Sequence, residues 1–275
     1  MIKTIAIQGA EGSNHHKVAR DFYGNDIQLK ECLSFDTLVY SLLDKTSDQA
    51  IMALENTIAG SIIPNYALID KNDLHICGEQ YLNIHHHLMA LPNQSINDIK
   101  EVSSHPMALL QCKTFFKQYP HIKLVEDVDT AEVAKRISNN QLMGVAAIAP
   151  KIAAEIFNLE VIEDDIQTMK DNATRFVIIQ TEKPNNGIDS IDKASMKFQL
   201  DHKRGSLAAI LNVLSDCKMN LTKIQSLPII ETPWKYAFFV DVTFDNYKNF
   251  EKAKAIIEIM ALDFKILGEY KNAKL

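Results

Sequence analysis

The sequence predicts an α/β protein in which a mostly parallel sheet is followed by a small ferredoxin-like domain. Up to Thr181, short apolar strands alternate with amphipathic helices, a pattern typical of parallel strands joined by helices. After Thr181 the sequence becomes polar and turn-rich over residues 183–190, which indicates a linker. Polar side chains also cluster where several strands end, and α/β proteins usually bind ligands at such strand ends.

Composition narrows the class of protein. The chain has 275 residues, of which 47% are hydrophobic and 23% charged, as expected for a globular protein with a substantial core. The net charge is -6 and no basic stripe is present, so we expect no nucleic-acid partner. No signal segment opens the chain and no apolar run approaches membrane-spanning length, so we expect a cytoplasmic protein without a membrane partner.

Neither the cysteines nor the histidines predict a metal site. The four cysteines are scattered without a C-x-x-C pair, so we expect reduced thiols that pack as small hydrophobic groups. His85, His86 and His87 are adjacent in an apolar, strand-like context. Neighbouring strand residues face opposite ways, so the three side chains cannot all bind one ion.

The N-terminal elements follow a strand, glycine turn and helix order. Such a turn offers free backbone N–H groups and the positive end of a helix dipole to an anion, although it is also a common connector. A later strand at 50–54 again ends in polar residues, Glu55 to Ser61. The expected elements are a strand at 2–7, a helix at 16–23, a strand at 27–31, a helix capped by Ser34 or Asp36, and the strand at 50–54.

The middle of the chain continues this alternation. An apolar stretch at 74–91 can carry the chain into a second lobe. Pro106 suits the first turn of a helix, and Asp129 with Glu132 resembles a capping box. The expected elements are a strand ending at 102–106, a helix at 107–117, a strand at 122–125, a helix at 131–137, a strand at 144–149, a helix at 152–157 and a strand at 159–162.

Beyond the linker, the pattern predicts the order β-α-β-β-α-β of a ferredoxin-like domain. Met196, Phe198 and Leu200 alternate with polar residues, which predicts a half-exposed first strand. The expected later elements are a helix with the stripe Leu207, Ile210, Leu211 and Leu214, strands at 220–226 and 236–244 around Pro228 and Pro233, a helix with Ala253, Ile256, Ile257 and Met260, and a strand at 265–269.

One short stretch concentrates chemically active side chains. Asp171, Asn172, Thr174 and Arg175 lie directly before an apolar run at 176–179. A dense polar cluster at the mouth of a buried strand favours a ligand site. The alternative is a turn that holds Asn172 in a tight conformation, with Arg175 on the surface.

Five separated motifs run along the chain in order. They are Gly12-Ser13…His16…Ala19, Leu54-Glu55-Asn56-Thr57, the run Ser104 to Cys112 (S-H-P-M-A-L-L-Q-C), Asn172-x-Thr174-Arg175-Phe176, and Gly205-x-Leu207 with Asn220-Leu221-Thr222-Lys223-Ile224. Taken together, and over nearly the whole chain, they resemble the motifs of prephenate dehydratases with a C-terminal ACT domain. No chorismate-mutase segment precedes residue 1, so the resemblance is to the monofunctional form.

The resemblance implies a function and a domain plan. The family converts prephenate to phenylpyruvate in phenylalanine biosynthesis, losing carbon dioxide and water without a cofactor. Its catalytic domain has a cleft between two α/β lobes and resembles type II periplasmic binding proteins. The implied plan is a catalytic domain at 1–182 (lobe 1 at 1–78 and 160–182, lobe 2 at 79–159), a linker at 183–193 and an ACT regulatory domain at 194–275.

The resemblance also implies catalytic roles. It gives Thr174 the central role, as hydrogen-bond donor to the departing ring hydroxyl. An alcohol is a poor acid near neutral pH, so we expect a positioned hydrogen bond and not full proton transfer. Arg175 has the shape to clamp a carboxylate, but in an extended strand it faces away from Thr174, which leaves a structural ion pair as the alternative. Asn56, Ser104 and Gln111 are implied as neutral donors that orient substrate oxygens.

Four further residues are expected to contact substrate. Ser13 and the N–H groups near Gly12 can bind a substrate carboxylate at the start of a helix. Glu55 is either an acid or a structural partner, and we favour the structural role. Thr57 and Phe176 complete the expected substrate-binding set.

The C-terminal motifs imply that L-phenylalanine acts as an allosteric effector. Where the family reads E-S-R-P, this chain has Gln225-Ser226-Leu227-Pro228, and the loss of an acid and an arginine puts the strength of feedback inhibition in doubt. ACT domains resemble one another in packing their sheets side by side, so we expect a homodimer or homotetramer. The implied effector-binding residues are Gly205, Leu207, Asn220, Leu221, Gln225 and Ser226.

Other departures concern the surroundings of the proposed donors. The aromatic and small hydroxyl positions of the first motif are Asn14 and His15, the proline of P-I-E-N is Ala53, and the first glutamine of S-H-P-Q is Met107. Two alternative functions stay open. One is an arogenate dehydratase, which performs the same chemistry on a substrate with an amino group in place of the keto group. The other is a non-catalytic amino-acid sensor, against which the intact Asn-x-Thr-Arg-Phe motif argues.

Overall fold

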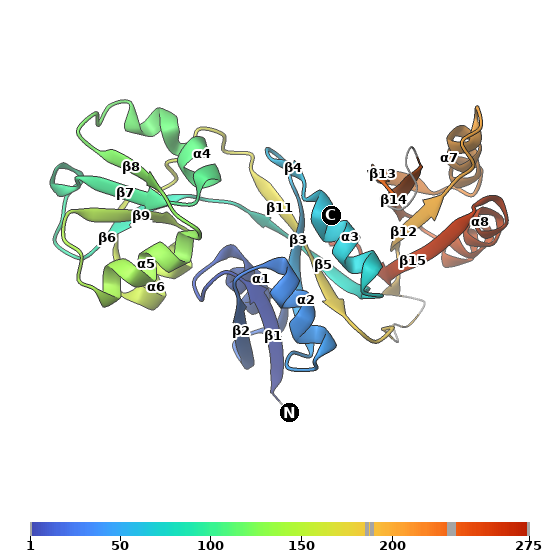
Figure 1. Ribbon diagram of the computed structural model, residues 1–275, viewed down its shortest axis with the longest axis horizontal. Helices are drawn as coiled ribbons and strands as arrows, with labels where there is room; N and C mark the ends of the chain where they lie inside the picture. The colour runs from blue at the N-terminus through green and yellow to red at the C-terminus, as the bar shows by residue number, and fades with distance from the viewer. Residues whose placement is uncertain (1, 185–186, 188–189, 230–234, 274–275) are drawn as a thin grey trace. The chain divides into compact units, whose positions relative to one another are not determined.

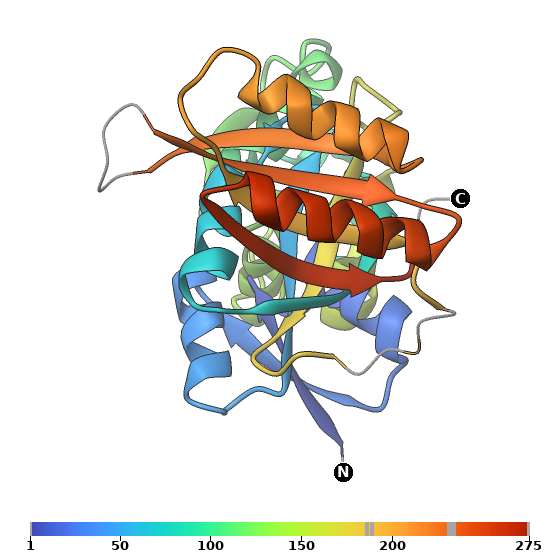
Figure 2. The same cartoon turned by 90° about the vertical axis from the view of Figure 1, so that its right-hand side faces the viewer.

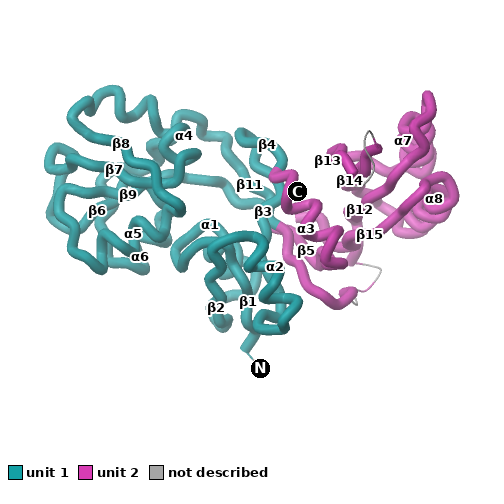
Figure 3. Tube along the Cα trace, viewed as in Figure 1, with its two compact units in different colours: residues 1–61, 81–176 teal, residues 62–80, 177–275 magenta. Residues whose placement is uncertain are grey.

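The computed structural model describes residues 2–184, 187, 190–229 and 235–273 (Figure 1). The chain forms two compact units (Figure 3): unit 1 is Met1–Ser61 with Tyr81–Phe176, and unit 2 is Ile62–Gln80 with Val177–Leu275. Part of the predicted linker (185, 186, 188 and 189) and Pro233 lie outside the described residues. The domain boundaries stay a prediction. Within the described chain, no helix is both long and apolar enough to cross a membrane.

The first sheet of unit 1 contains the parallel strands that the sequence predicts. β1 pairs in parallel with β2 and with β3, with Ile5 opposite Leu29 and Gln49. β11 follows β3 on the other side, giving the order β11-β3-β1-β2. The elements are β1 (Lys3–Gln8), α1 (Asn14–Tyr23), β2 (Ile27–Cys32), α2 (Phe35–Leu43), β3 (Gln49–Asn56), β4 (Gly60–Ser61) and β11 (Ala173–Gln180), of which β11 continues into unit 2.

The second sheet of unit 1 has the order β10-β6-β9-β7-β8. Its strands β7, β8 and β9 are parallel, whereas β6 and β10 are antiparallel to their neighbours. Ala146, Ala147 and Ala149 of β9 are fully buried, and such small side chains let α5 pack closely on this strand. The elements are β6 (His87–Ala90), η1 (Ile96–Asp98), β7 (Glu101–Ser104), α4 (Pro106–Phe116), β8 (Lys123–Glu126), α5 (Thr130–Asn139), β9 (Val145–Ala149), α6 (Lys151–Phe157) and β10 (Glu160–Glu163).

Unit 2 contains the predicted β-α-β-β-α-β order, and that prediction is confirmed. Its sheet has the order β13-β14-β12-β15-β5, and Figure 2 shows both of its later helices on one face of this sheet. Gly268 lies where β15 pairs with β5, and an added Cβ there would come within 2.3 Å of the Ile76 carbonyl oxygen. The elements are α3 (Ile63–Lys71), β5 (His75–Asn83), β12 (Lys193–Gln199), α7 (Ser206–Asp216), β13 (Asn220–Pro228), β14 (Tyr236–Thr243), α8 (Tyr247–Met260) and β15 (Asp263–Tyr270).

The prediction that β12 is half-exposed is wrong. Its polar residues Lys193 and Lys197 are buried, with exposed fractions of 2% and 9%. Lys193 Nζ lies 2.8 Å from both carboxylate oxygens of Glu79 on β5, and Lys197 Nζ lies 2.8 Å from Asp70 on α3. The alternation of apolar and polar residues is real, but the polar face is covered by acidic partners from α3 and β5 that sequence reasoning did not foresee.

The Glu79–Lys193 pair generates a stability prediction. Lys193→Ala leaves the Glu79 carboxylate buried without its ammonium partner, because the two side chains are only 0% and 3% exposed. We expect the free energy of unfolding to fall by about 3–5 kcal/mol, the usual cost of breaking a buried pair, as measured by urea unfolding. Lys203→Ala, which removes an exposed pair with Asp201, is the matched control and should leave the midpoint unchanged. An unchanged midpoint for Lys193→Ala would refute the prediction.

Candidate active site

Three segments of unit 1 meet where β3 ends and β11 begins. The Thr57 N–H donates to the Ala173 carbonyl at 2.9 Å, and the Ala173 N–H donates to Thr57 Oγ1 at 2.9 Å. The Ile84 N–H, just beyond β5, donates to the Asn172 carbonyl at 2.7 Å. These hydrogen bonds bring the motif that contains Asn56 beside the motif that contains Thr174.

The Asn56 carboxamide has a defined orientation. Its Oδ1 accepts from the backbone N–H groups of Ile58 and Ala59 at 2.9 and 2.8 Å. Because backbone N–H groups can only donate, the opposite end of the carboxamide must be the NH₂ group. That group donates to Asn172 Oδ1 at 2.7 Å and to Thr174 Oγ1 at 2.9 Å.

The same donor-to-acceptor direction of the hydrogen bonds continues from Asn172 to helix α4. Asn172 Nδ2 donates to Gln111 Oε1 at 3.0 Å, and His86 Nε2 lies 2.7 Å from the same oxygen. Since Gln111 Oε1 is an acceptor, neutral His86 carries its hydrogen on Nε2. Burial lowers the pKa of His86, against a smaller raising effect of the Gln111 hydrogen bond. A neutral imidazole therefore completes a line of donors and acceptors from Asn56 to His86, which we call the Asn56 network.

This network determines what Thr174 can do. Its side-chain oxygen accepts from Asn56, and within the described residues no other hydrogen bond to that oxygen is present. The hydroxyl hydrogen is consequently available to donate to a bound molecule. The residue is 7% exposed, so a hydrogen bond from it would form in a poorly hydrated place, where such bonds are strongest. The arrangement suits the stabilisation of charge that develops on an oxygen atom.

Two of the predicted catalytic residues lie apart from the Asn56 network. Ser104 is fully buried and its hydroxyl donates to the Ile148 carbonyl of β9 at 2.7 Å, so it ties two strands together. Arg175 is 3% exposed and follows Thr174 in an extended strand, which directs it to the opposite face. The surface turn that was the alternative for Arg175 is excluded by this burial.

At the anion site predicted near Gly12, the Gly12 N–H and the Ser13 side chain already have hydrogen-bond partners within α1. The Gly12 N–H donates to His16 Nδ1 at 2.9 Å, and the Ser13 side chain caps α1 by accepting from the His16 N–H. Phe176 is buried, and its ring contacts that of His15 with the centroids 5.0 Å apart. Burial lowers the pKa of His15 to about 3. Mainly through burial, and then through Arg20, the pKa of His16 falls to about 4.

The remaining predicted substrate residues lie at the edge of the network. Glu55 is half-buried near the end of β3, where it pairs with Ser61 of β4. Thr57 is exposed, and its backbone N–H and its hydroxyl oxygen make the two hydrogen bonds with Ala173 described above. Both are close in sequence to Asn56, and their side chains play no part in the hydrogen bonds from Asn56 to His86.

Sequence reasoning missed two members of the network, Asn172 and His86. Asn172 had a signal, since it opens the motif that contains Thr174. No sequence signal distinguished His86, because its neighbours His85 and His87 are also histidines. In the structure the run alternates: His86 binds Gln111, whereas His85 and His87 bind Asp165 and Asp164. Among the residues that the structure describes, no group of three or more His, Cys, Asp or Glu side chains could hold a metal ion.

The predicted effector residues lie in unit 2. Gly205 caps α7 with a φ of 84°, a conformation that favours glycine. Leu207 lines a cavity of about 180 Å³ together with Ser206, Tyr236 and Phe238. The other predicted effector residues, Asn220, Leu221, Gln225 and Ser226, lie along β13.

Comparison with known proteins identifies relatives along the whole chain. The family model for prephenate dehydratase matches residues 5–184. A chloroplastic protein of Arabidopsis thaliana, named arogenate dehydratase/prephenate dehydratase 2, is 33% identical over 276 residues, which cover 97% of this chain and 72% of that protein.

Solved structures show the same fold. A prephenate dehydratase from Arthrobacter aurescens in complex with L-Phe is 25% identical with a TM-score of 0.84, over 98% of this chain and 90% of that chain. The structure of GqqA, described as a novel type of quorum-quenching acylase, has a TM-score of 0.86 at 22% identity over 99% of both chains. At that identity the likeness shows the fold alone.

The two buried histidines beside the site generate a pH prediction. Their pKa values lie below the ordinary value of 6.5, so below pH 6.5 the unfolded chain takes up protons that the folded chain refuses. Stability is complete above pH 6.5 and falls as the pH decreases toward 4. His15→Phe removes one of these groups, and we expect a shallower decrease of the unfolding free energy between pH 6.5 and 4.

Urea unfolding at several pH values measures this slope. His121, which is exposed, provides the control variant His121→Gln, which should follow the wild-type slope. A slope for His15→Phe equal to that of the wild type would contradict the assignment.

Proposed function

The chain belongs to the prephenate dehydratase family, and from that premise we propose that it converts prephenate to phenylpyruvate in phenylalanine biosynthesis. Members of this family are carbon–oxygen lyases, and so is this chain. The choice of Thr174 as the catalytic group rests on one hydrogen bond. The Thr174 side-chain oxygen accepts from Asn56 at 2.9 Å, which leaves the hydroxyl hydrogen for the substrate.

The reaction makes a specific demand on that hydrogen. As the ring carboxylate leaves as carbon dioxide, the electrons of the broken C–C bond enter the ring. The ring becomes aromatic and the C–O bond breaks, so the hydroxyl oxygen departs with the bonding pair and becomes water on protonation. A hydrogen bond from Thr174 to this oxygen strengthens as negative charge grows on it, and therefore stabilises the transition state more than the substrate.

The Asn56 network serves as the positioning element of this proposal. Each member constrains the next, from the Ile58 and Ala59 N–H groups to Gln111. A Thr174 hydroxyl that is already oriented avoids reorganisation during the reaction, and preorganised donors are effective for that reason. Gln111 Nε2 lies at the end of this line and is a candidate donor to a substrate oxygen.

Arogenate is the alternative substrate. The Arabidopsis relative carries both activities in its name, and the two substrates differ only by an amino in place of a keto group. Comparison of kcat/KM for the two acids decides between them. A clear preference for arogenate would overturn the choice of prephenate, and failure to form phenylpyruvate from either acid would favour the non-catalytic sensor.

Regulation is the second part of the proposal. The C-terminal ferredoxin-like part of unit 2 is assigned as an ACT domain that binds L-phenylalanine, supported by the Arthrobacter structure in complex with L-Phe. The cavity that Leu207 lines is a candidate part of that site. Assembly into a homodimer or homotetramer and a cytoplasmic location remain expectations from the sequence.

Removal of the Thr174 hydroxyl tests the catalytic proposal. We expect Thr174→Ala to lower kcat by a factor of about 10² or more, the usual effect of losing one transition-state donor, with little change in KM. Phenylpyruvate formation from prephenate measures both constants. Thr114→Ala, which removes an exposed hydroxyl from α4, is the control and should keep the wild-type kcat. Near-normal turnover by Thr174→Ala would remove this residue from the mechanism.

Titration with phenylalanine tests the regulatory proposal. Gln225 and Leu227 stand where the family has an acid and an arginine, so we expect weak inhibition or a shift in subunit assembly. Activity assays and light scattering at increasing phenylalanine concentrations measure the two effects. Tight, cooperative inhibition would show that these two residues do not weaken the effector site.

A further inference from the structure

Three hydrogen bonds from separate parts of the chain hold His86. Its backbone N–H donates to Gln167 Oε1 at 2.9 Å, and its carbonyl accepts from the Ile166 N–H at 2.9 Å. Its ring nitrogen Nε2 lies 2.7 Å from Gln111 Oε1 on α4. The first two bonds fix the main chain of this segment, so the ring bond is not needed to hold the segment in place.

The imidazole of His86 is placed at a cost to stability. The residue is 5% exposed, and within the described chain its Nδ1 is buried without a hydrogen-bond partner. In the neutral ring with its hydrogen on Nε2, Nδ1 is an acceptor, and a buried acceptor without a donor has lost the hydrogen bonds that it made to water. An apolar side chain of similar size would avoid this loss. Stability alone therefore does not explain a histidine at this position.

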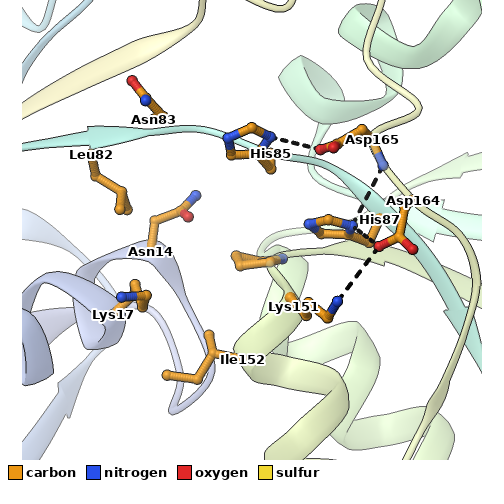
Figure 4. A pocket seen from close by; sticks show the side chains of 11 residues that line it. Asn14, Lys17, Leu82, Asn83, His85, His87, Lys151, Ile152, Asp164 and Asp165 are labelled. Carbon is orange, nitrogen blue, oxygen red and sulfur yellow. Dashed lines mark hydrogen bonds and ion pairs between the residues drawn. The ribbon is translucent and has the colours of Figure 1, made fainter.

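The neighbouring histidines lie in a different environment. His85 and His87 line a cavity of about 540 Å³, where their rings bind Asp165 and Asp164 (Figure 4). His86 is not part of this lining, and its ring binds Gln111. The ring of His86 can therefore be replaced without changing the cavity wall, and His85 provides a control position from the same run.

Gln111 is the residue through which His86 can affect a bound substrate. Its Oε1 accepts from Asn172 Nδ2 at 3.0 Å and from His86 Nε2 at 2.7 Å. Since both donors bind the oxygen, the NH₂ group is the free end of the carboxamide, and among the described residues it makes no hydrogen bond. A single hydrogen bond would let the carboxamide pivot, whereas two donors from different segments fix its plane.

We propose that His86 is a positioning residue for the reaction: by donating from Nε2 to Gln111 Oε1, it holds the Gln111 NH₂ group toward a substrate oxygen. This inference rests on the proposed function. A donor that is oriented before the reaction needs no reorganisation during it, which makes it more effective. The buried, unpaired Nδ1 is the stability cost of this orientation, a conflict between function and stability that is common at active sites.

Replacement of the ring by an apolar side chain separates positioning from structural support. We expect His86→Leu to lower kcat/KM for prephenate by a factor of about 10 or more, because the Gln111 carboxamide loses one of its two donors. The midpoint of urea unfolding should stay the same or rise, because Gln111 Oε1 keeps Asn172 and no buried ring nitrogen is left unpaired. His86→Gln, whose amide nitrogen can take the place of Nε2, should restore most of the activity. His85→Leu is the control and should keep the wild-type kcat/KM.

A double variant tests whether His86 acts through Gln111. Gln111→Met removes both the acceptor and the donor of the carboxamide, so adding His86→Leu to it should lower kcat/KM further by no more than a factor of about two. Effects that multiply would show that His86 acts elsewhere and would overturn the inference. A loss of activity in His86→Leu that comes with an equal loss of stability would also overturn it, because structural support would then explain both.

A measurement without catalysis keeps this inference separate from the proposed function. The imidazole ¹⁵N resonances of His86, assigned by their loss in His86→Leu, should show the hydrogen on Nε2 near neutral pH. If the wild type forms phenylpyruvate and His86→Leu keeps the wild-type kcat/KM, the inference fails and the proposed function stands. If the wild type forms no phenylpyruvate, the proposed function fails. A hydrogen on Nε2 would then still support the orientation of Gln111 by His86, and a hydrogen on Nδ1 would overturn it.

Discussion

Two backbone N–H groups, those of Ile58 and Ala59, are the constraint on which the candidate active site depends. A backbone N–H can only donate, so these two groups must bind the oxygen of the Asn56 carboxamide. Its NH₂ group therefore faces Thr174. Every later step of the network inherits this polarity. The turn after β3 therefore controls the hydrogen-bonding state of a hydroxyl on β11, more than a hundred residues away in the sequence.

The segment around β5 contributes both to the Asn56 network of unit 1 and to the stability of unit 2. In unit 2, Glu79 on β5 holds the buried Lys193 ammonium. In unit 1, the chain that follows β5 supplies His86 to the Asn56 network, whereas His85 and His87 bind Asp165 and Asp164. This division of three consecutive histidines follows from the alternation of an extended chain. The same alternation that argued against a metal site explains how one short segment serves two different environments.

Much of the fold was predictable because its signals are local. Pro106 begins α4 and Asp129 caps α5 as expected, and the β-α-β-β-α-β order of unit 2 follows from periodicity alone. β12 shows where such reasoning ends. Its alternation correctly predicted a strand with a polar face, but whether that face meets water or acidic partners depends on α3 and β5, which are distant in sequence.

The sequence by itself determined the family and most of the order of the elements, and it led to the prediction that Asn56, Gln111 and Thr174 are site residues, since these lie in motifs that can be recognised one segment at a time. Only the tertiary structure decided their chemistry. In the folded chain the Ser104 hydroxyl donates to the Ile148 carbonyl, and Arg175 lies on the other face of the strand from Thr174. Asn172 and His86 join the Asn56 network. The physical reason is that a hydrogen bond between distant segments depends on where their backbones meet, and no pattern within either segment specifies that meeting point.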